Sequence, residues 1–226
     1  MQRLRKMKIA DNFFIYFWNN PKENNCNSYV IDGKVPVLID PGLEQRVDNL
    51  FDRMREDGFD PNRIEVVIGT HCHPDHFTGS RRFAGSNVKV ALSREEEKFM
   101  IDEGSRWYSS QGKDAPEFPV TFYLKEGDLK IGKHEFEVFL TPGHSPGSLS
   151  VYWPRNRTLI CGDVIFRGSI GRVDLPGGNG QQLKQSIEKL SKLKVDLILP
   201  GHGPAIQGSA NVEGNFQLIR NYFRMM

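Results

Sequence analysis

The sequence predicts an α/β protein in which two mixed β-sheets pack face to face and helices cover both outer faces, an αββα sandwich. Two observations predict this class. Short segments rich in aromatic and β-branched residues alternate with segments whose apolar positions recur at helical spacing. This succession occurs twice along the chain, and each half closes with helices. A chain of 226 residues, 38% of them hydrophobic, can bury one core, so a single domain over residues 1–226 is expected.

The first half opens with three short segments that predict antiparallel strands, since turn formers such as Asp32-Gly33 separate them. These strands are expected at residues 13–18, 28–31 and 35–39. Apolar residues at helical spacing predict a helix over residues 43–55, which Gly58 ends. The apolar run at 64–68 then predicts a buried strand.

A strand at residues 88–92 leads into the next predicted helix. Ser93, followed three residues later by Glu96, has the spacing of a capping box, so a helix is expected to about residue 101. The polar segment 104–119 is interpreted either as a lid over a pocket or as a surface loop. In the second half, strands are expected at 136–140, 148–153, 158–161 and 195–199, and helices at 181–193 and 211–224.

The charge balance excludes some classes of partner. A net charge of +2 predicts no strong field for nucleic acid or for an anionic membrane. The basic residues near the start, which we interpret as a solvated terminus, are Arg3, Arg5, Lys6 and Lys8. The apolar run 13–18 is far shorter than the ~20 residues that span a bilayer, and nothing before it resembles a signal peptide. The expectation is a cytoplasmic protein without membrane or nucleic-acid partners.

The three cysteines are an odd number in dissimilar contexts, which argues against a disulfide framework and favours a reducing compartment. Cys161 ends an apolar run and is expected to be buried, while Cys26 has no partner in a C-x-x-C pair. Cys72 lies between His71 and His73. Because neighbouring side chains on an extended segment point to opposite sides, Cys72 is expected to face away from whatever the two histidines share.

Three of the six histidines fall in one short segment directly after the predicted strand 64–68. Its sequence is Thr70-His71-Cys72-His73-Pro74-Asp75-His76. Where the chain leaves the sheet, His71 and His73 can project to one side, and Asp75 and His76 point back toward them from a first helical turn. Nitrogen and oxygen donors at this density suit zinc, iron or manganese. A surface turn rich in His and Asp is the alternative.

Three more predicted strands end in metal-capable side chains. His144 lies in the turn Thr141-Pro142-Gly143-His144-Ser145-Pro146-Gly147, Asp163 follows Cys161-Gly162, and His202 lies in Pro200-Gly201-His202-Gly203-Pro204. Neighbouring glycines allow the backbone to turn sharply at each place. The sixth histidine, His134, stands between Lys133 and Glu135 and is interpreted as a surface residue.

Together, the H-x-H-x-D-H set, the TPGHSPG turn, the Gly-Asp pair and the PGHGP run resemble the metallo-β-lactamase superfamily, from about Leu38-Ile39-Asp40-Pro41-Gly42 to His202. The resemblance implies that superfamily's fold and two divalent metal ions, zinc first, with iron or manganese as alternatives. It implies that His71, His73 and His144 hold one metal, that Asp75, His76 and His202 hold the second, and that Asp163 bridges them. Asp75 and Asp163 are the expected catalytic residues. Asp40 matches an aspartate that orients a ligand or the local backbone.

Within the superfamily, segments 162–166 and 169–179 are similar to the glyoxalase II-like hydrolases, which implies hydrolysis of a small thioester by metal-activated hydroxide. Arg172 and Asp174 in the second segment are expected to form an ion pair rather than to act in catalysis. Glyoxalase II proper carries a basic carboxyl-terminal helical segment that grips glutathione. About two dozen residues follow His202 here, so the carrier thiol is left open.

The sequence also allows other functions. A persulfide dioxygenase on the same fold would use one iron, held here by His71, His144 and Asp163, and a lactone or β-lactam hydrolase would use the same metals with another pocket. From other classes, a nucleic-acid-processing protein is disfavoured by the near-neutral charge. A non-catalytic metal-binding module is disfavoured because a structural zinc site needs four ligands and seven are present. The acyl group and the oligomeric state are not predicted.

Overall fold

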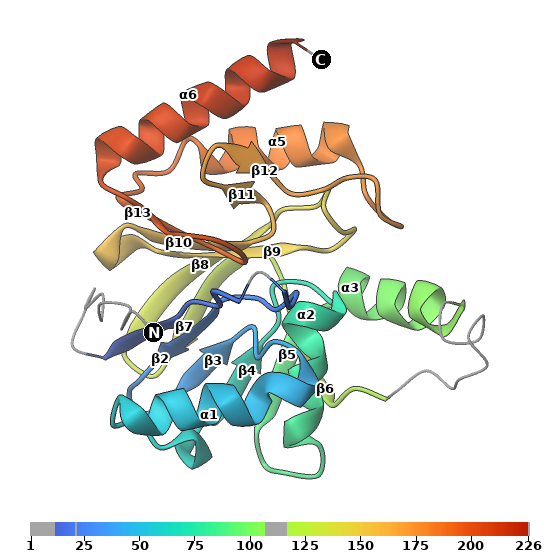
Figure 1. Cartoon of the computed structure of the whole chain (residues 1–226), viewed down its shortest axis with the longest axis vertical. Coiled ribbons are helices and arrows are strands. Elements are labelled where there is room, and N and C mark those ends of the chain that lie inside the picture. The colour runs from blue at the N-terminus through green and yellow to red at the C-terminus, as the bar shows by residue number, and fades with distance from the viewer. Residues whose placement is uncertain (1–11, 21, 107–116, 226) are drawn as a thin grey trace.

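The computed structural model describes residues 12–20, 22–106 and 117–225. Its architecture is the predicted sandwich, in which two six-stranded mixed sheets pack face to face and helices lie on the outer faces (Figure 1). The basic cluster near the start lies outside the described residues, and so does most of segment 104–119, predicted as a lid or a loop. Within the described ranges, no helix is long and apolar enough to cross a bilayer.

The amino-terminal half of the chain forms the first sheet, with the spatial order β1-β2-β3-β4-β5-β6. Pairing is antiparallel from β1 to β3 and parallel from β3 to β6. The strands are β1 Phe13–Tyr16, β2 Ser28–Ile31, β3 Val37–Ile39, β4 Val66–Ile68, β5 Lys89–Ser93 and β6 Val120–Leu124. Because β3, β4 and β5 are parallel, their carboxyl ends meet at one edge of the sheet, where Asp40 and the histidine-rich segment follow.

The second sheet has the order β14-β13-β10-β9-β8-β7, and only β10 and β13 are parallel in it. The strands are β7 Gly127–Ile131, β8 His134–Leu140, β9 Leu149–Trp153, β10 Thr158–Gly162, β13 Leu197–Pro200 and β14 Ile206–Gln207. A separate hairpin consists of β11 Ile165–Phe166 and β12 Ser169–Ile170. The parallel pair brings the carboxyl ends of β10 and β13 together, and with them the residues that follow.

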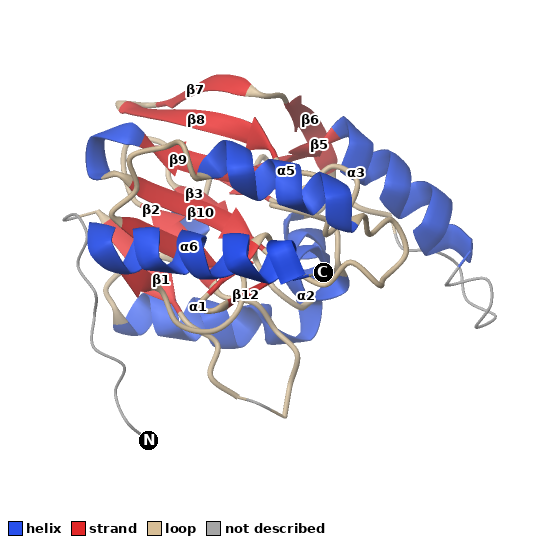
Figure 2. Ribbon diagram, turned by 90° about the horizontal axis from the view of Figure 1, so that it is seen from above, coloured by secondary structure: helices blue, strands red, loops and turns tan. Residues whose placement is uncertain are grey.

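Helices complete the sandwich, with α1 over the first sheet and α5 and α6 over the second (Figures 1 and 2). The α-helices are α1 Val47–Glu56, α2 Pro74–Phe77, α3 Arg94–Phe99, α5 Gly180–Leu190 and α6 Ser209–Met225. Short 3-10 turns are η1 Glu44–Arg46, η2 Pro61–Arg63, η3 Thr78–Phe83 and η5 Pro154–Asn156, and η4 Met100–Gly104 is a π-helix. Asn179 caps α5, since its side chain accepts a hydrogen bond from the Gln182 backbone N–H at 3.0 Å.

Alternation along the strands divides the core into three layers. In β3, Ile39 packs in the central cluster between the two sheets, whereas Leu38 packs in the cluster beneath α1. In β13, Leu199 joins the central cluster and Ile198 joins the cluster beneath α5 and α6. Each sheet is therefore apolar on both faces, as expected for sheets that are covered on both sides.

Several element bounds differ from the predictions. β1 ends at Tyr16, and the backbone N–H of Trp18 donates to Asn27 Oδ1 at 2.9 Å. The helix predicted over 43–55 begins as the 3-10 turn η1 before α1. The helix predicted from residue 94 to about 101 runs further, because α3 continues as the π-helix η4. The strands β6, β7, β11, β12 and β14 were not predicted.

Candidate metal centre

The structure brings together all seven side chains that the sequence singles out as potential ligands. His71 and His73 follow β4, Asp75 and His76 lie on α2, His144 lies in the turn after β8, and Asp163 and His202 follow β10 and β13. Their donor atoms form three groups that could hold a metal ion. The groups are His71, His73 and His144; His71, His76 and Asp163; and Asp75, His76 and His202.

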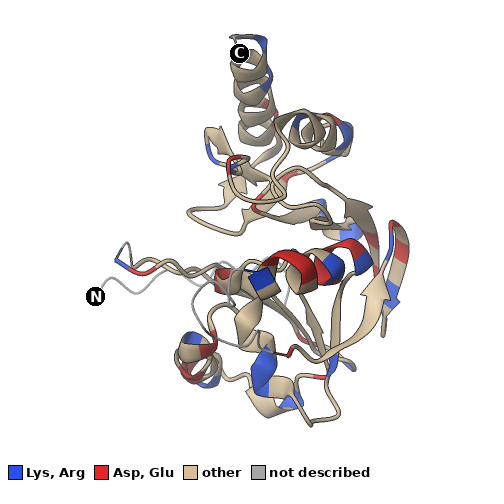
Figure 3. Cartoon of the chain, turned by 90° about the vertical axis from the view of Figure 1, so that its right-hand side faces the viewer, with Lys and Arg blue, Asp and Glu red and all other residues tan. Residues whose placement is uncertain are grey.

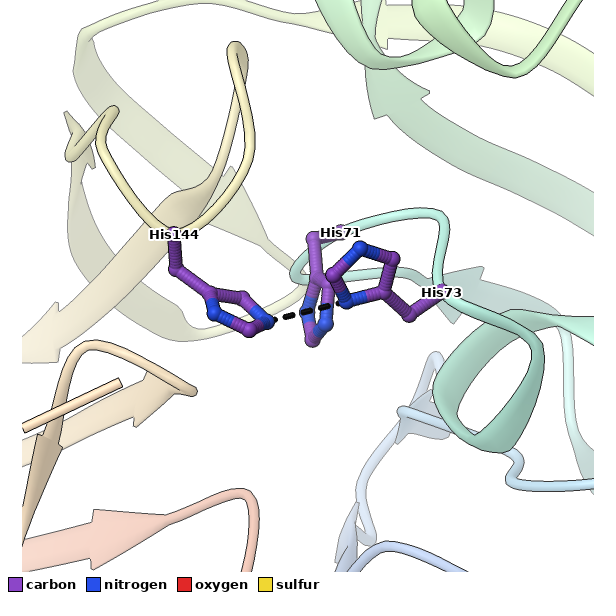
Figure 4. A group of neighbouring side chains, drawn as sticks. All are labelled: His71, His73 and His144. Carbon is purple, nitrogen blue, oxygen red and sulfur yellow. Dashed lines mark hydrogen bonds between the residues drawn. The ribbon is translucent and has the colours of Figure 1, made fainter. Parts of the chain in front are cut away.

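The first group is a triangle of imidazoles (Figure 4). His73 Nδ1 lies 2.9 Å from His144 Nε2, and the ring centre of His71 lies 4.7 Å from that of His73 and 4.9 Å from that of His144. The Nε2 atom of His71 is buried and has no hydrogen-bond partner among the described residues. A buried nitrogen without a partner is costly, so this atom is suited to a ligand that the triangle would hold.

The group of Asp75, His76 and His202 joins α2 to the end of β13. His202 Nε2 lies 3.1 Å from Asp75 Oδ2 and 3.2 Å from His76 Nε2. Asn24 donates a hydrogen bond to Asp75 Oδ2 at 2.9 Å and thereby fixes the carboxylate from the other side. Two nitrogens and one oxygen therefore point at one place.

Asp163 lies between this group and the triangle of His71, His73 and His144. Its Oδ1 atom is 3.2 Å from His76 Nε2, while Oδ2 is 3.6 Å from His144 Nε2 and 3.5 Å from His202 Nε2. Oδ1 is buried without a hydrogen-bond partner among the described residues. One carboxylate is thus within reach of both groups, a position from which it could bridge two cations.

Asp40 supports the histidine segment from behind, as predicted. Its carboxylate accepts hydrogen bonds from Thr70 N at 2.7 Å, from Thr70 Oγ1 at 2.8 Å and from His76 Nδ1 at 2.9 Å. Thr70 Oγ1 also lies 3.1 Å from His71 Nδ1. Since the threonine hydroxyl donates to Asp40, its oxygen accepts the N–H of His71. One carboxylate therefore orients two imidazoles.

These contacts decide which nitrogens are free to bind a cation. The Nδ1–H groups of His71 and His76 point outward to Thr70 and Asp40, and His144 Nδ1 donates to the backbone carbonyl of Arg172 at 2.8 Å. In a neutral ring the other nitrogen, Nε2, then carries a lone pair directed into the centre. Together with the partnerless atoms of His71 and Asp163, this arrangement fits borderline divalent cations such as zinc or iron.

The electrostatics favour neutral rings at His71 and His73. Burial, and then the neighbouring imidazoles, keep the pKa of His71 well below its usual value. Burial and His144 lower the pKa of His73 to about 4. Burial raises the pKa of Asp75, but the hydrogen bond from His202 and the charges of His76 and His202 outweigh it and leave that pKa lowered. At neutral pH His71 and His73 are therefore neutral and Asp75 is ionised. His76 differs, because burial lowers its pKa but the nearby Cys26, Asp163 and Asp40 outweigh burial and raise that pKa well above the usual value.

At Gly201 and Gly162 the backbone packs so closely against residues of the centre that a side chain would not fit. A Cβ atom at Gly201 would lie 2.1 Å from Asp163 Oδ1 and 2.5 Å from His76 Cε1, so any larger residue would displace a ligand. Gly162 has φ of 49°, and a Cβ atom there would lie 2.4 Å from Thr70 Oγ1. The glycines beside Asp163 and His202 are thus required by close packing as well as by the turn.

Glu96 is a supporting residue that the sequence analysis missed. Its buried carboxylate accepts hydrogen bonds from Cys72 N at 2.8 Å and from Gly147 N at 2.7 Å, and so ties the histidine segment to the turn that carries His144. The capping prediction is right for Ser93, whose hydroxyl accepts from Glu96 N at 3.1 Å. It is wrong for Glu96, because both carboxylate oxygens bond elsewhere. The only local signal that separates Glu96 from Glu95 and Glu97 is its spacing from Ser93, and that signal predicts a helix cap rather than a contact with the centre.

Other residues singled out from the sequence fall largely as expected. Cys72 packs in the apolar cluster beneath α1 and belongs to none of the potential ligand groups, and Cys161 is fully buried. Arg172 and Asp174 form an exposed ion pair with an N···O distance of 2.8 Å. His134 lies outside the centre and is half-buried, so the prediction that it is a surface residue is only partly right. Its ring packs edge-on against Trp153 at 5.1 Å, and its Nε2 atom is buried.

Comparison with known proteins agrees with this architecture. Residues 21–202 match the family described as the metallo-beta-lactamase superfamily. The chain therefore belongs to the metallo-β-lactamase superfamily, whose members bind metal ions.

Individual relatives are similar over most of the chain. The probable metallo-hydrolase MJ0888 of Methanocaldococcus jannaschii is 32% identical over 185 residues, which cover 79% of this chain and 88% of that protein. Hydroxyacylglutathione hydrolase GloC of Haemophilus influenzae is 33% identical over 188 residues, which cover 80% and 86%. The crystal structure of TTHA1623 in a di-iron-bound form has a TM-score of 0.69 at 29% identity and covers 87% of this chain and 96% of that one.

Proposed function

We propose that the protein is a dinuclear metal-dependent hydrolase that cleaves a small-molecule thioester. The position of Asp163 is the observation that supports this most, because its two oxygens lie 3.2 to 3.6 Å from imidazole nitrogens of both ligand groups. In this proposal Asp163 is shared, one metal is held by His71, His73 and His144, and the other by Asp75, His76 and His202.

When bound, two divalent ions act as Lewis acids that lower the pKa of water and polarise a carbonyl oxygen. Zinc is the first choice for these nitrogen and oxygen donors, with iron or manganese as alternatives. The chain's own part is to hold the donors in place. Asp75 and Asp163 are the proposed catalytic carboxylates, since both have lowered pKa values and supply negative charge that offsets the cations. Asp75, fixed by Asn24 and His202, is the group that would orient the attacking water.

The choice of a thioester rests on the leaving group. Every imidazole at the centre is a ligand in this proposal, so none of them is left to protonate a poor leaving group. A thiolate leaves without such help, because thiols are far more acidic than alcohols or amines. The similarity to GloC, a hydroxyacylglutathione hydrolase, supports the same substrate class. The three free, buried cysteines support a reducing compartment such as the cytoplasm.

The test compares His202→Ala with His134→Gln, a change at the one histidine outside the centre. Metal content and hydrolysis of a thioester panel are measured for the wild type and both variants, with zinc and iron loaded separately. Loss of one ligand of the second metal should bring the content down toward one ion per chain and reduce turnover by at least ~10²-fold. The His134→Gln protein should keep both metals and its activity.

Two outcomes would contradict the proposal. A ceiling of one ion per wild-type chain under every loading condition would remove the dinuclear centre. Oxygen uptake on glutathione persulfide that survives in His202→Ala, with negligible thioester cleavage in either protein, would instead indicate the one-iron dioxygenase, whose ligands His71, His144 and Asp163 this substitution leaves in place.

A further inference from the structure

A cavity of about 680 Å³ lies directly beside the candidate metal centre. His73, a member of the imidazole triangle, lines it together with Pro74. The opposite wall comes from α3 and η4, and Leu175 and Pro176 of the loop after β12 close a third side. This volume is in the range of small-molecule binding sites. A molecule whose reacting group lies at the metal centre could therefore extend into the cavity.

The walls of the cavity are largely apolar. Phe99, Met100, Ile101, Phe118 and Leu175 all line it. Ile101 is 56% exposed, so this part of the apolar wall is open to solvent.

The wall is also packed firmly where the loop after β12 meets α3. A Cβ atom at Gly177 would lie 2.8 Å from both Phe99 Cε2 and Pro146 Cδ, so the loop touches the helix and the turn of His144. Little room remains for this side of the cavity to collapse, and its shape is therefore largely preformed.

Among the described residues that line the cavity, the carboxylates are the charged groups. Glu97, Glu103 and Glu117 line it, and the described part of the lining contains no Lys or Arg. Figure 3, in which α3 faces the viewer, shows acidic positions prominent along this helix with basic ones between them. Tyr123 donates a hydrogen bond to Glu97, and Arg106 on the next turn pairs with Glu103. An anionic group entering here would meet like charge, whereas a neutral chain would not.

We propose that this cavity binds an uncharged apolar chain of the substrate, so that the substrate class is a thioester with an extended hydrocarbon group. The inference rests on the proposed function and specifies which thioesters would be substrates. Burying methylenes against such walls is worth up to about fourfold in kcat/KM for each one. Carboxylate-bearing chains, including the anionic ends of glutathione, fit this side of the centre poorly.

The first experiment varies the chain on the metal-loaded protein. Acetyl, butanoyl, hexanoyl and octanoyl thioesters of N-acetylcysteamine keep a neutral thiol constant, and S-octyl thioacetate places the chain on the thiol instead. If the cavity takes the acyl chain, we expect kcat/KM to rise by at least ~10²-fold from the acetyl to the octanoyl thioester of N-acetylcysteamine. If it takes the chain of the thiol, the same rise is expected from the acetyl thioester of N-acetylcysteamine to S-octyl thioacetate. An acyl chain ending in a carboxylate should lose most of that gain.

The second experiment places a cation in the cavity wall. Ile101→Lys changes an exposed residue and should fold, and it should reduce the octanoyl-to-acetyl ratio of kcat/KM by ~10-fold while improving the carboxylate-ended chain. Leu218→Lys is the matched control, because Leu218 is 51% exposed on α6 and does not line the cavity. Its ratio should equal that of the wild type.

A binding measurement separates failure of this inference from failure of the proposed function. Calorimetric titration with 1-octanol and with octanesulfonate needs no turnover. Tighter binding of octanol than of octanesulfonate, weakened at least ~5-fold by Ile101→Lys and not by Leu218→Lys, supports the cavity even if no thioester is cleaved. Thioester turnover without any chain-length dependence, or octanol binding equal in the two variants, overturns the cavity assignment and leaves the hydrolase proposal in place.

Discussion

The two halves of the chain contribute to the metal centre in different ways. The first half concentrates four potential ligands in the six residues from His71 to His76, on one strand end and one short helix. The second half supplies His144, Asp163 and His202 singly, each after a different strand. A local motif can specify one side of such a centre. The other side depends on the sheet order that places β10 beside β13.

The supports differ as well. In the first half, side-chain carboxylates form hydrogen bonds to the segment from Thr70 to His76. They belong to Asp40, which follows β3, and to Glu96 of α3. The second-half ligands depend more on close backbone packing, with Gly162 and Gly201 fitting against Thr70, His76 and Asp163. We therefore expect the largest loss of metal binding and activity when Asp163, the potential shared ligand of the second half, is removed. Changing Asp40 or Glu96, which support the first-half segment, should have smaller effects.

The largest effect is expected for Asp163→Ala. Both ligand groups lose the carboxylate between them, so metal content should fall for both sites and hydrolysis by more than ~10²-fold. Cys72→Ala is the control for metal content, since Cys72 lies between two potential ligands in sequence but packs in the apolar cluster beneath α1 and belongs to none of the potential ligand groups. Elemental analysis and thioester turnover would be measured in both. Equal losses of metal in the two variants would show that Cys72 takes part in the centre. The distinction between the ligands of the first half and those of the second half would then be wrong.

A smaller effect is expected for Asp40→Asn. Asparagine tolerates the positive φ of 52° at this position, so the backbone is kept. Only one of its side-chain atoms can accept hydrogen bonds, whereas the carboxylate accepts from Thr70 on one oxygen and from Thr70 and His76 on the other. Metal affinity, measured by competition with a chelator, should fall about 10- to 100-fold. Unchanged affinity would mean that the first-half segment holds its shape without this support.

The smallest effect is expected for Glu96→Gln. The amide group would face the N–H of either Cys72 or Gly147, leaving a buried donor without a partner at a cost of about 1–3 kcal/mol in the free energy of unfolding. Glu95→Gln on the exposed side of the same helix is the control and should change stability by less than about 0.5 kcal/mol. Denaturant unfolding of the metal-free proteins measures both. Matching values would show that Glu96 does not tie the two halves together.

The local parts of the structure were predictable from the sequence, and the non-local parts were not. Aromatic and β-branched residues identified the strand at 28–31, and helical spacing identified α1, although the first residues of the predicted helix form the 3-10 turn η1. β7 is mostly exposed and polar, and two-residue strands such as β14 have no periodicity to detect. The prediction of the fold class did not require these strands, because β7 and β14 lie at the edges of the second sheet and do not change the number of layers.

The centre shows the same division. Its seven candidate residues could be found because each stands at a strand end beside turn-forming residues. Glu96 could not, since the backbone groups that it binds lie 24 and 51 residues away along the chain. The contact of His134 with Trp153 on the neighbouring strand could not be predicted either, because the residues beside His134 in the sequence are charged. Contacts of this kind depend on strand order, which no local pattern reports.

The burial of all three cysteines has a consequence for the proposed thioester hydrolysis. Burial raises the pKa of Cys26 and Cys72 well above the usual value and that of Cys161 to about 12. Only a thiolate attacks a thioester or exchanges with a disulfide. Cys72 forms part of the cavity wall, where an acyl chain would pass close to it, yet it remains protonated. In the proposed thioester hydrolysis, these buried and protonated sulfur atoms would therefore not take up the acyl group of the substrate.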